Sequence, residues 1–406
     1  MKLIEQIRSE FSYISQGCNG RNVVYFDNAA TSQRPDSLLR KLDEWQRYAN
    51  ANVHRAVHCL SANATENYEA ARAAVRDFIN ASSEREIIFT SGTTASINLL
   101  ANIFSQAKIG QGDTILITQA EHHSNMVPWQ MVCKSRGARL EYIPIKENGE
   151  WDLSILDGLL ASSRVKIISA AHISNVLGIV NPVEELIKKA HSYGVPVHID
   201  GAQGIVHSKV DVRALDCDFY SFSGHKMYAA TGTGVLYGKL NFLEELPPWM
   251  GGGDMVDTVT YRDTTYNVPP LKFEAGTPNF IGQATLLPAI EFMKQLRSSE
   301  IIENEKMLIA YLEEQLRNID GLRILGDSPA RTLLFSFVVE GVHHSDIATL
   351  MDQMGFALRS GLLCSEPLID KFGYNGVVRI SPAPYNTMQE CEQFIKSLRR
   401  VISMLK

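Results

Sequence analysis

Short apolar segments alternate with helical segments through the first two thirds of the chain, and this alternation limits the possible folds more than any other feature. Runs rich in apolar and β-branched residues lie at 86–90, 114–118, 140–145, 165–173, 195–200, 219–224 and 234–238. Helical periodicity lies between most of them, at 66–80, 94–107 and 181–194. Strands joined by helices form a mostly parallel sheet with helices on both faces. Continuous apolar strands fit a sheet that is buried on both sides. We therefore predict an α/β fold with a mostly parallel central sheet.

The chain changes character after this region. From about 247 to 280 it is rich in Gly and Pro and has no helical period, which is typical of a functional or interface segment. Helices then alternate with a few strands up to a closing helix that starts near residue 388. We predict three parts, with approximate boundaries. They are an N-terminal helical segment at 1–20, a large domain at 21–285 with a Gly/Pro-rich extension at 250–280, and a smaller C-terminal α+β domain at 286–406.

Composition argues against several classes of function. The 406 residues include 39 Lys and Arg against 45 Asp and Glu, a net charge of −6. Proteins that wrap nucleic acid or bind anionic membranes need a basic surplus instead. No apolar run is long enough to cross a bilayer, and charged residues interrupt the N-terminal segment, so we expect neither a membrane span nor a secretory signal. Six scattered cysteines without a C-x-x-C pair suggest a reducing compartment. We therefore expect a cytoplasmic enzyme without nucleic-acid or membrane partners.

Two motifs at strand ends offer a reactive amine and an acid. Lys226 ends the sequence SGHK at 223–226. Ligands of open parallel sheets bind at the carboxyl ends of the strands, and burial there lowers the pKa of a lysine, so that it reacts as a free amine. In DGAQ at 200–203, Asp200 can keep a ring nitrogen protonated and Gln203 can donate to a neighbouring phenolate oxygen. The alternatives are an exposed lysine and an aspartate that caps a helix.

A third motif offers a phosphate site. The sequence SGTTAS at 91–96 follows a strand and opens a helix. Backbone N–H groups at a helix start bind anions, and Thr93 and Thr94 add hydroxyl groups. Ser223 and His225 can supply further donors from the lysine motif. The motif is weak when it is taken alone.

Two more strand ends complete the set. EHHSN at 121–125 offers His123 as a ring that can stack on a cofactor, with metal binding as the main alternative. SNVLG at 174–178 offers the amide of Asn175. A phosphate cradle, a stacking ring, an amide, an acid and a lysine on successive strand ends predict a pyridoxal phosphate site and no metal site.

Three residues of the second half can act on a substrate. Arg379 lies on a predicted strand, where a fixed guanidinium can bind a carboxylate through two hydrogen bonds. Cys364 lies in a segment rich in Gly, Ser and Pro, with Arg359 nearby, which favours an exposed thiolate nucleophile. Buried filler is the alternative for a lone cysteine.

These motifs, together with YFDNAATS at 25–32, GGG at 251–253 and FEAGTPN at 273–279, resemble the class V, fold-type I pyridoxal phosphate enzymes. More narrowly, the chain resembles the group II (Suf-type) cysteine desulfurases over nearly its whole length. The resemblance implies a fold-type I transferase that acts as a homodimer and converts L-cysteine to L-alanine. It also implies a persulfide on Cys364, whose sulfur passes to an acceptor protein (SufE- or SufU-like) for iron–sulfur cluster assembly or related sulfur trafficking.

The resemblance implies a role for each motif residue. Lys226 would bind the cofactor covalently, His123 would stack on its ring, and Cys364 would attack the substrate sulfur. The cofactor-binding set would be Thr93, Thr94, His123, Asn175, Asp200, Gln203, Ser223, His225 and Lys226, with Thr277 from the other subunit. The substrate-binding set would be Asn175, Arg359 and Arg379.

The chain also departs from this family. Leu362 and Leu363 stand where the family usually has two histidines, and Ser365 stands where it usually has alanine. The alternative function is therefore a selenocysteine lyase, or a cystine or cysteine C–S lyase, of the same fold, for which Cys364 is less essential. A non-catalytic partner protein that keeps only the fold is disfavoured by the presence of both Lys226 and Asp200.

Overall fold

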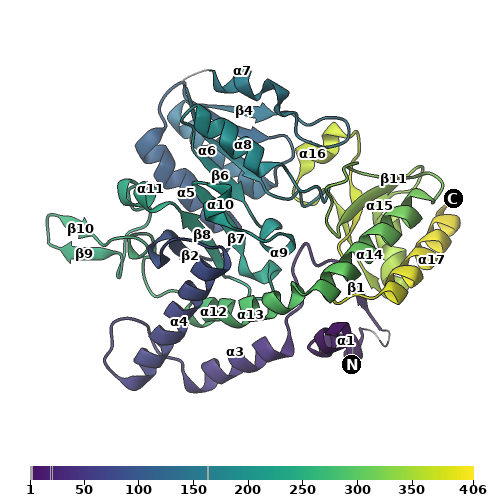
Figure 1. The fold of residues 1–406 in the computed structure, drawn as a ribbon, viewed down its shortest axis with the longest axis horizontal. Coiled ribbons are helices and arrows are strands. Elements are labelled where there is room, and N and C mark those ends of the chain that lie inside the picture. Colours follow the sequence, from purple (N-terminus) through teal and green to yellow (C-terminus); the bar gives the residue numbers. More distant parts are fainter. Residues whose placement is uncertain (1–2, 19, 21, 162–163) are drawn as a thin grey trace.

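A seven-stranded sheet forms the centre of the larger part of the molecule (Figure 1). The computed structural model describes residues 3–18, 20, 22–161 and 164–406. In spatial order the strands are β2 (Ile87–Thr90), β8 (Gly234–Gly238), β7 (Phe219–Ser223), β6 (Val197–Asp200), β5 (Val165–Ala171), β3 (Thr114–Thr118) and β4 (Arg139–Ile143). All neighbours run parallel except β8, which is antiparallel to both β2 and β7. The predicted α/β fold with a mostly parallel central sheet is confirmed.

Helices cover both faces of this sheet, because successive side chains of a strand point to opposite faces. Ile167 of β5 packs in a cluster with α5 (Thr93–Lys108) and α6 (Val127–Arg136). Its neighbour Ile168 belongs to the core on the other face. That core includes α4 (Cys59–Phe78), α8 (Val183–Ser192) and α13 (Leu286–Leu296). The strands are therefore apolar at nearly every position.

A second, antiparallel sheet has four strands in the order β11 (Leu322–Ile324), β12 (Phe335–Val339), β15 (Val377–Ile380) and β14 (Arg359–Gly361). It shares a separate hydrophobic cluster with α14 (Ser299–Arg317), α15 (His344–Gln353) and α17 (Met388–Leu405). Figure 1 shows these green and yellow helices at the end of the molecule away from α4. β1 (Val24–Tyr25) pairs in parallel with β13 (Phe356–Ala357), so the N-terminal region lies against this part of the chain. The domain boundaries themselves stay a prediction.

The remaining elements connect these parts. The helices are α1 (Leu3–Ser9), α2 (Tyr13–Gln16), α3 (Asp36–Tyr48), α7 (Leu156–Leu160), α9 (Gly204–His207), α10 (Val212–Leu215), α11 (Leu240–Glu245), α12 (Phe280–Ala284) and α16 (Glu366–Lys371). The Gly/Pro-rich segment contains an antiparallel hairpin, β9 (Val256–Val259) and β10 (Thr264–Tyr266), which projects from the body in Figure 1. Across the described ranges, no helix is long and apolar enough to cross a bilayer.

Candidate active site

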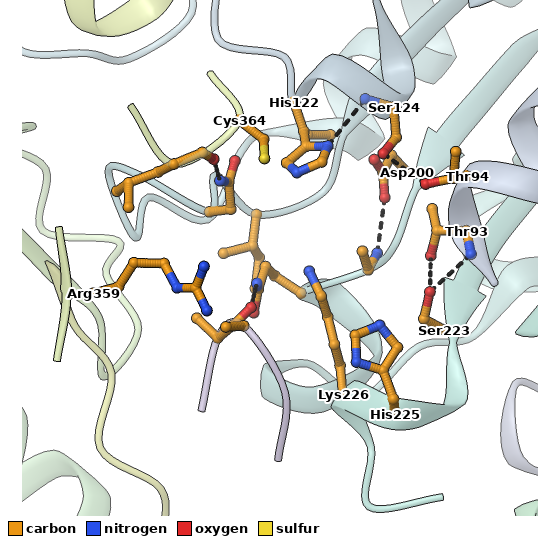
Figure 2. A pocket seen from close by; sticks show the side chains of 18 of the residues that line it. Thr93, Thr94, His122, Ser124, Asp200, Ser223, His225, Lys226, Arg359 and Cys364 are labelled. Carbon is orange, nitrogen blue, oxygen red and sulfur yellow. Dashed lines mark hydrogen bonds between the residues drawn. The ribbon is translucent and has the colours of Figure 1, made fainter. Parts of the chain in front are cut away.

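A cavity of about 290 Å³ opens at the carboxyl ends of the parallel strands, where these meet the second sheet (Figure 2). Its position follows from the topology, because side chains from several strand ends converge there. All the predicted site residues except His123 and Thr277 line it, namely Thr93, Thr94, Asn175, Asp200, Gln203, Ser223, His225, Lys226, Arg359, Cys364 and Arg379. The cavity also includes residues that sequence reasoning missed, namely Ala29, Ala30, His122, Ser124, Ala171, Ile173 and Ala202.

Lys226 presents its amine from the short turn after β7. The pKa of Lys226 is lowered to about 8, mainly by burial and also by the Arg379 cation, against the opposing effect of the Asp200 carboxylate. Figure 2 shows the Lys226 amine and the Asp200 carboxylate directed into the same space. A neutral, nucleophilic amine is therefore accessible near neutral pH.

Asp200 ends β6 at the floor of the cavity and is buried. Burial raises the pKa of this carboxyl, and two effects oppose the rise: a hydrogen bond of 2.9 Å from the Ala202 N–H, and the Lys226 cation. Gln203, in the next turn, donates from Nε2 to the carbonyl oxygen of Ala29 at 2.8 Å. This hydrogen bond orients the Gln203 side chain at the wall of the cavity.

The start of α5 forms a polar cradle in the wall of the cavity. Ser223 Oγ accepts a hydrogen bond of 2.8 Å from the Thr93 N–H and also lies 2.8 Å from Thr93 Oγ1. Gly92 precedes the helix with a φ of 148°, and a Cβ on Gly234 would lie 2.4 Å from the Gly92 Cα. Only glycine therefore lets β8 approach this helix start, where Thr93 and Thr94 line the cavity.

Further hydroxyl and imidazole groups lie beside the same cradle. Thr94 Oγ1 lies 2.9 Å from Ser124 Oγ, and His225 Nδ1 lies 3.3 Å from Thr31 Oγ1. Burial lowers the pKa of His225 to about 4, with a further contribution from the Lys226 cation, so this ring is neutral at physiological pH. The cradle therefore offers several donors to an anion at one end of the cavity.

The two histidines after β3 face different surroundings. His122 lines the cavity, whereas His123 lies in a separate groove with Val127, Gln130 and Glu366. His123 therefore does not line the cofactor cavity, contrary to the prediction. His122 is extended (φ −68°, ψ 150°) and His123 begins a 3₁₀ turn, so the two side chains diverge. Burial lowers the pKa of His122 to about 3, so its ring is neutral.

An ion-pair cluster holds both predicted arginines. Arg379 is buried on β15, with Nη2 at 3.1 Å from Asp27 Oδ1 and Nη1 donating to the Asn175 carbonyl oxygen at 3.0 Å. Nη2 of the more exposed Arg359 lies 2.9 Å from Asp27 Oδ2. Nε of Arg379 is buried and has no hydrogen-bond partner among the described residues. Asp27 is a site residue that the sequence analysis did not single out, although it lies in YFDNAATS at 25–32.

Cys364 follows β14 and exposes its thiol at the rim of the cavity. Leu363 and Cys364 both have left-handed backbone conformations, with φ of 52° and 55°. Leu363 is buried and lines the cavity, so the residue where the family usually has histidine forms an apolar wall.

Thr277 is exposed and lies outside this cavity, in the segment before α12. The resemblance predicts that Thr277 contacts the cofactor bound in the site of a second subunit. Across the described ranges, no cluster of three or more His, Cys, Asp or Glu side chains is arranged to bind a metal ion.

Comparisons with known proteins agree over the whole chain. The aminotransferase class-V family model matches residues 24–394. The chain is 45% identical over 402 residues to a probable cysteine desulfurase of Vibrio cholerae serotype O1, covering 99% of both chains. It is 42% identical over 405 residues to a cysteine desulfurase of Serratia proteamaculans, also covering 99% of both.

Solved structures give the same result. The cysteine desulfurase CsdA from Escherichia coli superposes with a TM-score of 0.92 at 36% identity, over 99% of both chains. An apo cysteine desulfurase from Thermococcus onnurineus NA1 superposes with a TM-score of 0.94 at 35% identity, over 100% of this chain and 99% of the other.

Proposed function

The chain belongs to the aminotransferase class-V family and is a pyridoxal phosphate-dependent cysteine desulfurase, and on that premise we propose that Lys226 holds the cofactor and that Cys364 takes the sulfur. The observation that carries this proposal is that Lys226, Asp200, Arg379 and Cys364 line one cavity. Asp200 ends β6 and Lys226 lies in the turn after β7, whereas Arg379 and Cys364 come from the second sheet and the loop after it. Their convergence supports one shared chemistry.

The cavity fits pyridoxal phosphate in three respects. The Lys226 amine suits the aldehyde, and the Asp200 carboxylate suits a protonated ring nitrogen. The α5 start with Thr93 and Ser223 suits the phosphate, because a helix start offers backbone N–H donors and both residues line the cavity. When bound, the cofactor supplies an electron-withdrawing ring that stabilises negative charge at the substrate Cα.

His122, rather than His123, is the ring that we assign to stack on the cofactor. It lines the cavity, and its Nδ1 accepts a hydrogen bond of 3.0 Å from the Ser124 N–H, which orients the imidazole. Gln203 and Asn175, which line the same cavity, remain assigned to cofactor contacts. Thr94 and His225 complete the phosphate set.

Arg379 is assigned to the carboxylate of L-cysteine. Asp27 fixes the guanidinium from one side, and Arg379 lines the cavity in which the substrate would bind. Asn175 lies beside it and lines the same cavity. Arg359 shares Asp27 and faces the loop that holds Cys364.

The proton and sulfur steps then follow from the positions of two side chains. Nζ of Lys226, with its lowered pKa, accepts the proton from the substrate Cα. The Cys364 thiolate attacks the substrate sulfur, so an S–S bond forms, the C–S bond breaks, and its electron pair stays on the substrate carbon. Protonation of that carbon leaves alanine, and Cys364 carries the persulfide. L-Cysteine plus the thiol thus gives L-alanine plus the persulfide, with all atoms conserved.

The finer assignments belong to the same proposal. We assign the chain to the group II (Suf-type) enzymes, with a homodimer in which Thr277 reaches the partner's phosphate site. The exposed position of Thr277, outside its own cavity, supports this arrangement. A sulfur-acceptor protein would take the persulfide sulfur from exposed Cys364 and pass it to iron–sulfur cluster assembly or related sulfur trafficking. All six cysteines lie in the described ranges and are free, which supports a cytoplasmic location.

Mass spectrometry of the protein after incubation with L-cysteine and no reductant tests the proposal. We expect one added sulfur atom on the peptide that contains Cys364, together with L-alanine in solution. Cys364→Ser should lose both products, while Cys18→Ser, which changes another exposed cysteine, should keep them. Alanine formation by Cys364→Ser at the wild-type rate would instead indicate a C–S lyase that does not need this thiol.

A further inference from the structure

The loop that carries Cys364 is held in a backbone conformation that non-glycine residues seldom adopt. Leu363 and Cys364 have φ of 52° and 55°, in the left-handed region where the side chain crowds the following carbonyl oxygen. Two consecutive residues in this region persist only where surrounding contacts hold them. The loop lies between β14 and α16, so contacts from the large sheet can supply that support.

His123 provides two of these contacts, one at the nucleophile itself and one two residues after it. Its backbone N–H donates to the Cys364 carbonyl oxygen at 2.7 Å. Its Nε2 lies 3.2 Å from the Glu366 backbone N and accepts a hydrogen bond from that N–H. This N–H belongs to the first residue of α16, where a helix leaves backbone donors without intrahelical partners. His123 therefore binds the backbone before and after Ser365.

Asn175 supports the same loop from the end of β5. Its Nδ2 donates to the Leu363 carbonyl oxygen at 2.9 Å, and its Oδ1 accepts from Ser365 Oγ at 3.2 Å. Consecutive carbonyl groups, of Leu363 and Cys364, each accept a hydrogen bond from a residue that follows a strand of the large sheet. The His123 ring lies on the outer side of the loop, away from the cavity.

We propose that His123 is a positioning residue, which holds the Cys364 loop so that the thiol faces the substrate sulfur. The proposal rests on the assignment of Cys364 as the nucleophile. It gives the two adjacent histidines separate tasks: His122 faces the cofactor cavity and His123 binds the nucleophile loop. Nε2 can accept from the Glu366 N–H only when the ring proton lies on Nδ1. A side chain that replaces His123 in this role therefore needs a hydrogen-bond acceptor at about the position of Nε2.

A matched set of substitutions tests this role. In His123→Gln the amide oxygen can reach the Glu366 N–H, whereas His123→Met has similar length without a comparable acceptor. We expect His123→Met to lower kcat about tenfold, the effect of one lost hydrogen bond, and His123→Gln to keep most of it. Single-turnover formation of the Cys364 persulfide should slow in parallel. KM for L-cysteine and the visible spectrum of the bound cofactor should stay unchanged in both variants. His123→Asn, whose amide is too short to reach Glu366, replaces the Met variant if that variant does not fold.

The outcomes separate this inference from the proposed function. A wild-type kcat in His123→Met, or equal losses in the Met and Gln variants, overturns the positioning role. A changed cofactor spectrum in His123→Met also overturns it, because His123 would then act at the ring. Alanine formation by Cys364→Ser contradicts the proposed function itself, whatever the His123 variants do.

Discussion

One carboxylate oxygen of Asp27 lies 3.1 Å from Nη2 of Arg379, although 352 residues separate them in the sequence. Both side chains are largely buried. The other oxygen of Asp27 lies 2.9 Å from Nη2 of Arg359. A segment near the N-terminus therefore orients both arginines of the second sheet at the edge of the cavity.

Replacement of Asp27 by asparagine should impair both stability and substrate binding. The substitution leaves the Arg379 guanidinium buried without its counter-ion, which typically lowers the free energy of unfolding by about 3 kcal/mol. A misoriented guanidinium should also raise KM for L-cysteine about tenfold. Chemical denaturation and steady-state kinetics measure the two effects. Asp43→Asn is the control, because Asp43 pairs with Arg47 on the surface and should change stability by less than about 1 kcal/mol. Equal effects of the two substitutions would contradict the assigned role of Asp27.

The α/β fold and most of the candidate site could be predicted from the sequence, because both depend on local patterns. Most strands of the large sheet are largely apolar, and polar motifs such as SGHK at 223–226 follow at the strand ends. Because the carboxyl ends of parallel strands lie at one edge of the sheet, the motifs are expected to lie close together. The hairpin β9–β10 leaves little periodic signal in its Gly/Pro-rich segment, because its strands are short and mostly exposed.

Other parts of the site depend on geometry that residue types do not specify. The choice between His122 and His123 depends on the backbone angles of the turn after β3. The pairing of Asp27 with Arg379 joins distant parts of the chain and leaves no periodic signal. The left-handed conformation at Leu363 and Cys364 is also unexpected, because neither residue type favours it.

Removal of the Ser223 hydroxyl should weaken binding of the cofactor phosphate. Ser223 Oγ contacts both Thr93 N and Thr93 Oγ1 at 2.8 Å, so it positions the start of α5. We expect Ser223→Ala to raise the dissociation constant of pyridoxal phosphate about tenfold. The dissociation constant of pyridoxal, which lacks the phosphate, should stay unchanged. Fluorescence or absorbance titration of the apo protein measures both constants. Equal weakening of the two ligands would show that Ser223 acts elsewhere in the cavity.

Capture of the cofactor should depend on pH through Lys226. Because burial lowers the pKa of Lys226 to about 8, the reactive free amine becomes populated as the pH rises through that value. The initial rate at which apo protein gains the visible absorbance of the cofactor should therefore rise about tenfold between pH 7 and pH 9. With the ordinary lysine pKa near 10.4, the rate of capture would keep rising strongly above pH 9, and that result would contradict the lowered pKa. Lys226→Ala should show no covalent capture at any pH.

A methyl group on Gly234 should disturb the phosphate cradle, because β8 touches the start of α5 at this position. Its Cβ would lie 2.4 Å from the Cα and 2.6 Å from the backbone N of Gly92, and neither backbone atom can move without shifting the helix start. We expect Gly234→Ala to lower the free energy of unfolding by about 3 kcal/mol through overpacking. It should also weaken pyridoxal phosphate binding, because the displaced atoms belong to the cradle.

Gly158→Ala is the control, since its Cβ would meet nothing within 4 Å in α7. That substitution should raise the free energy of unfolding by about 0.5 kcal/mol through the helix preference of alanine. A Gly234→Ala variant with wild-type stability and cofactor affinity would mean that β8 and α5 do not need this close approach.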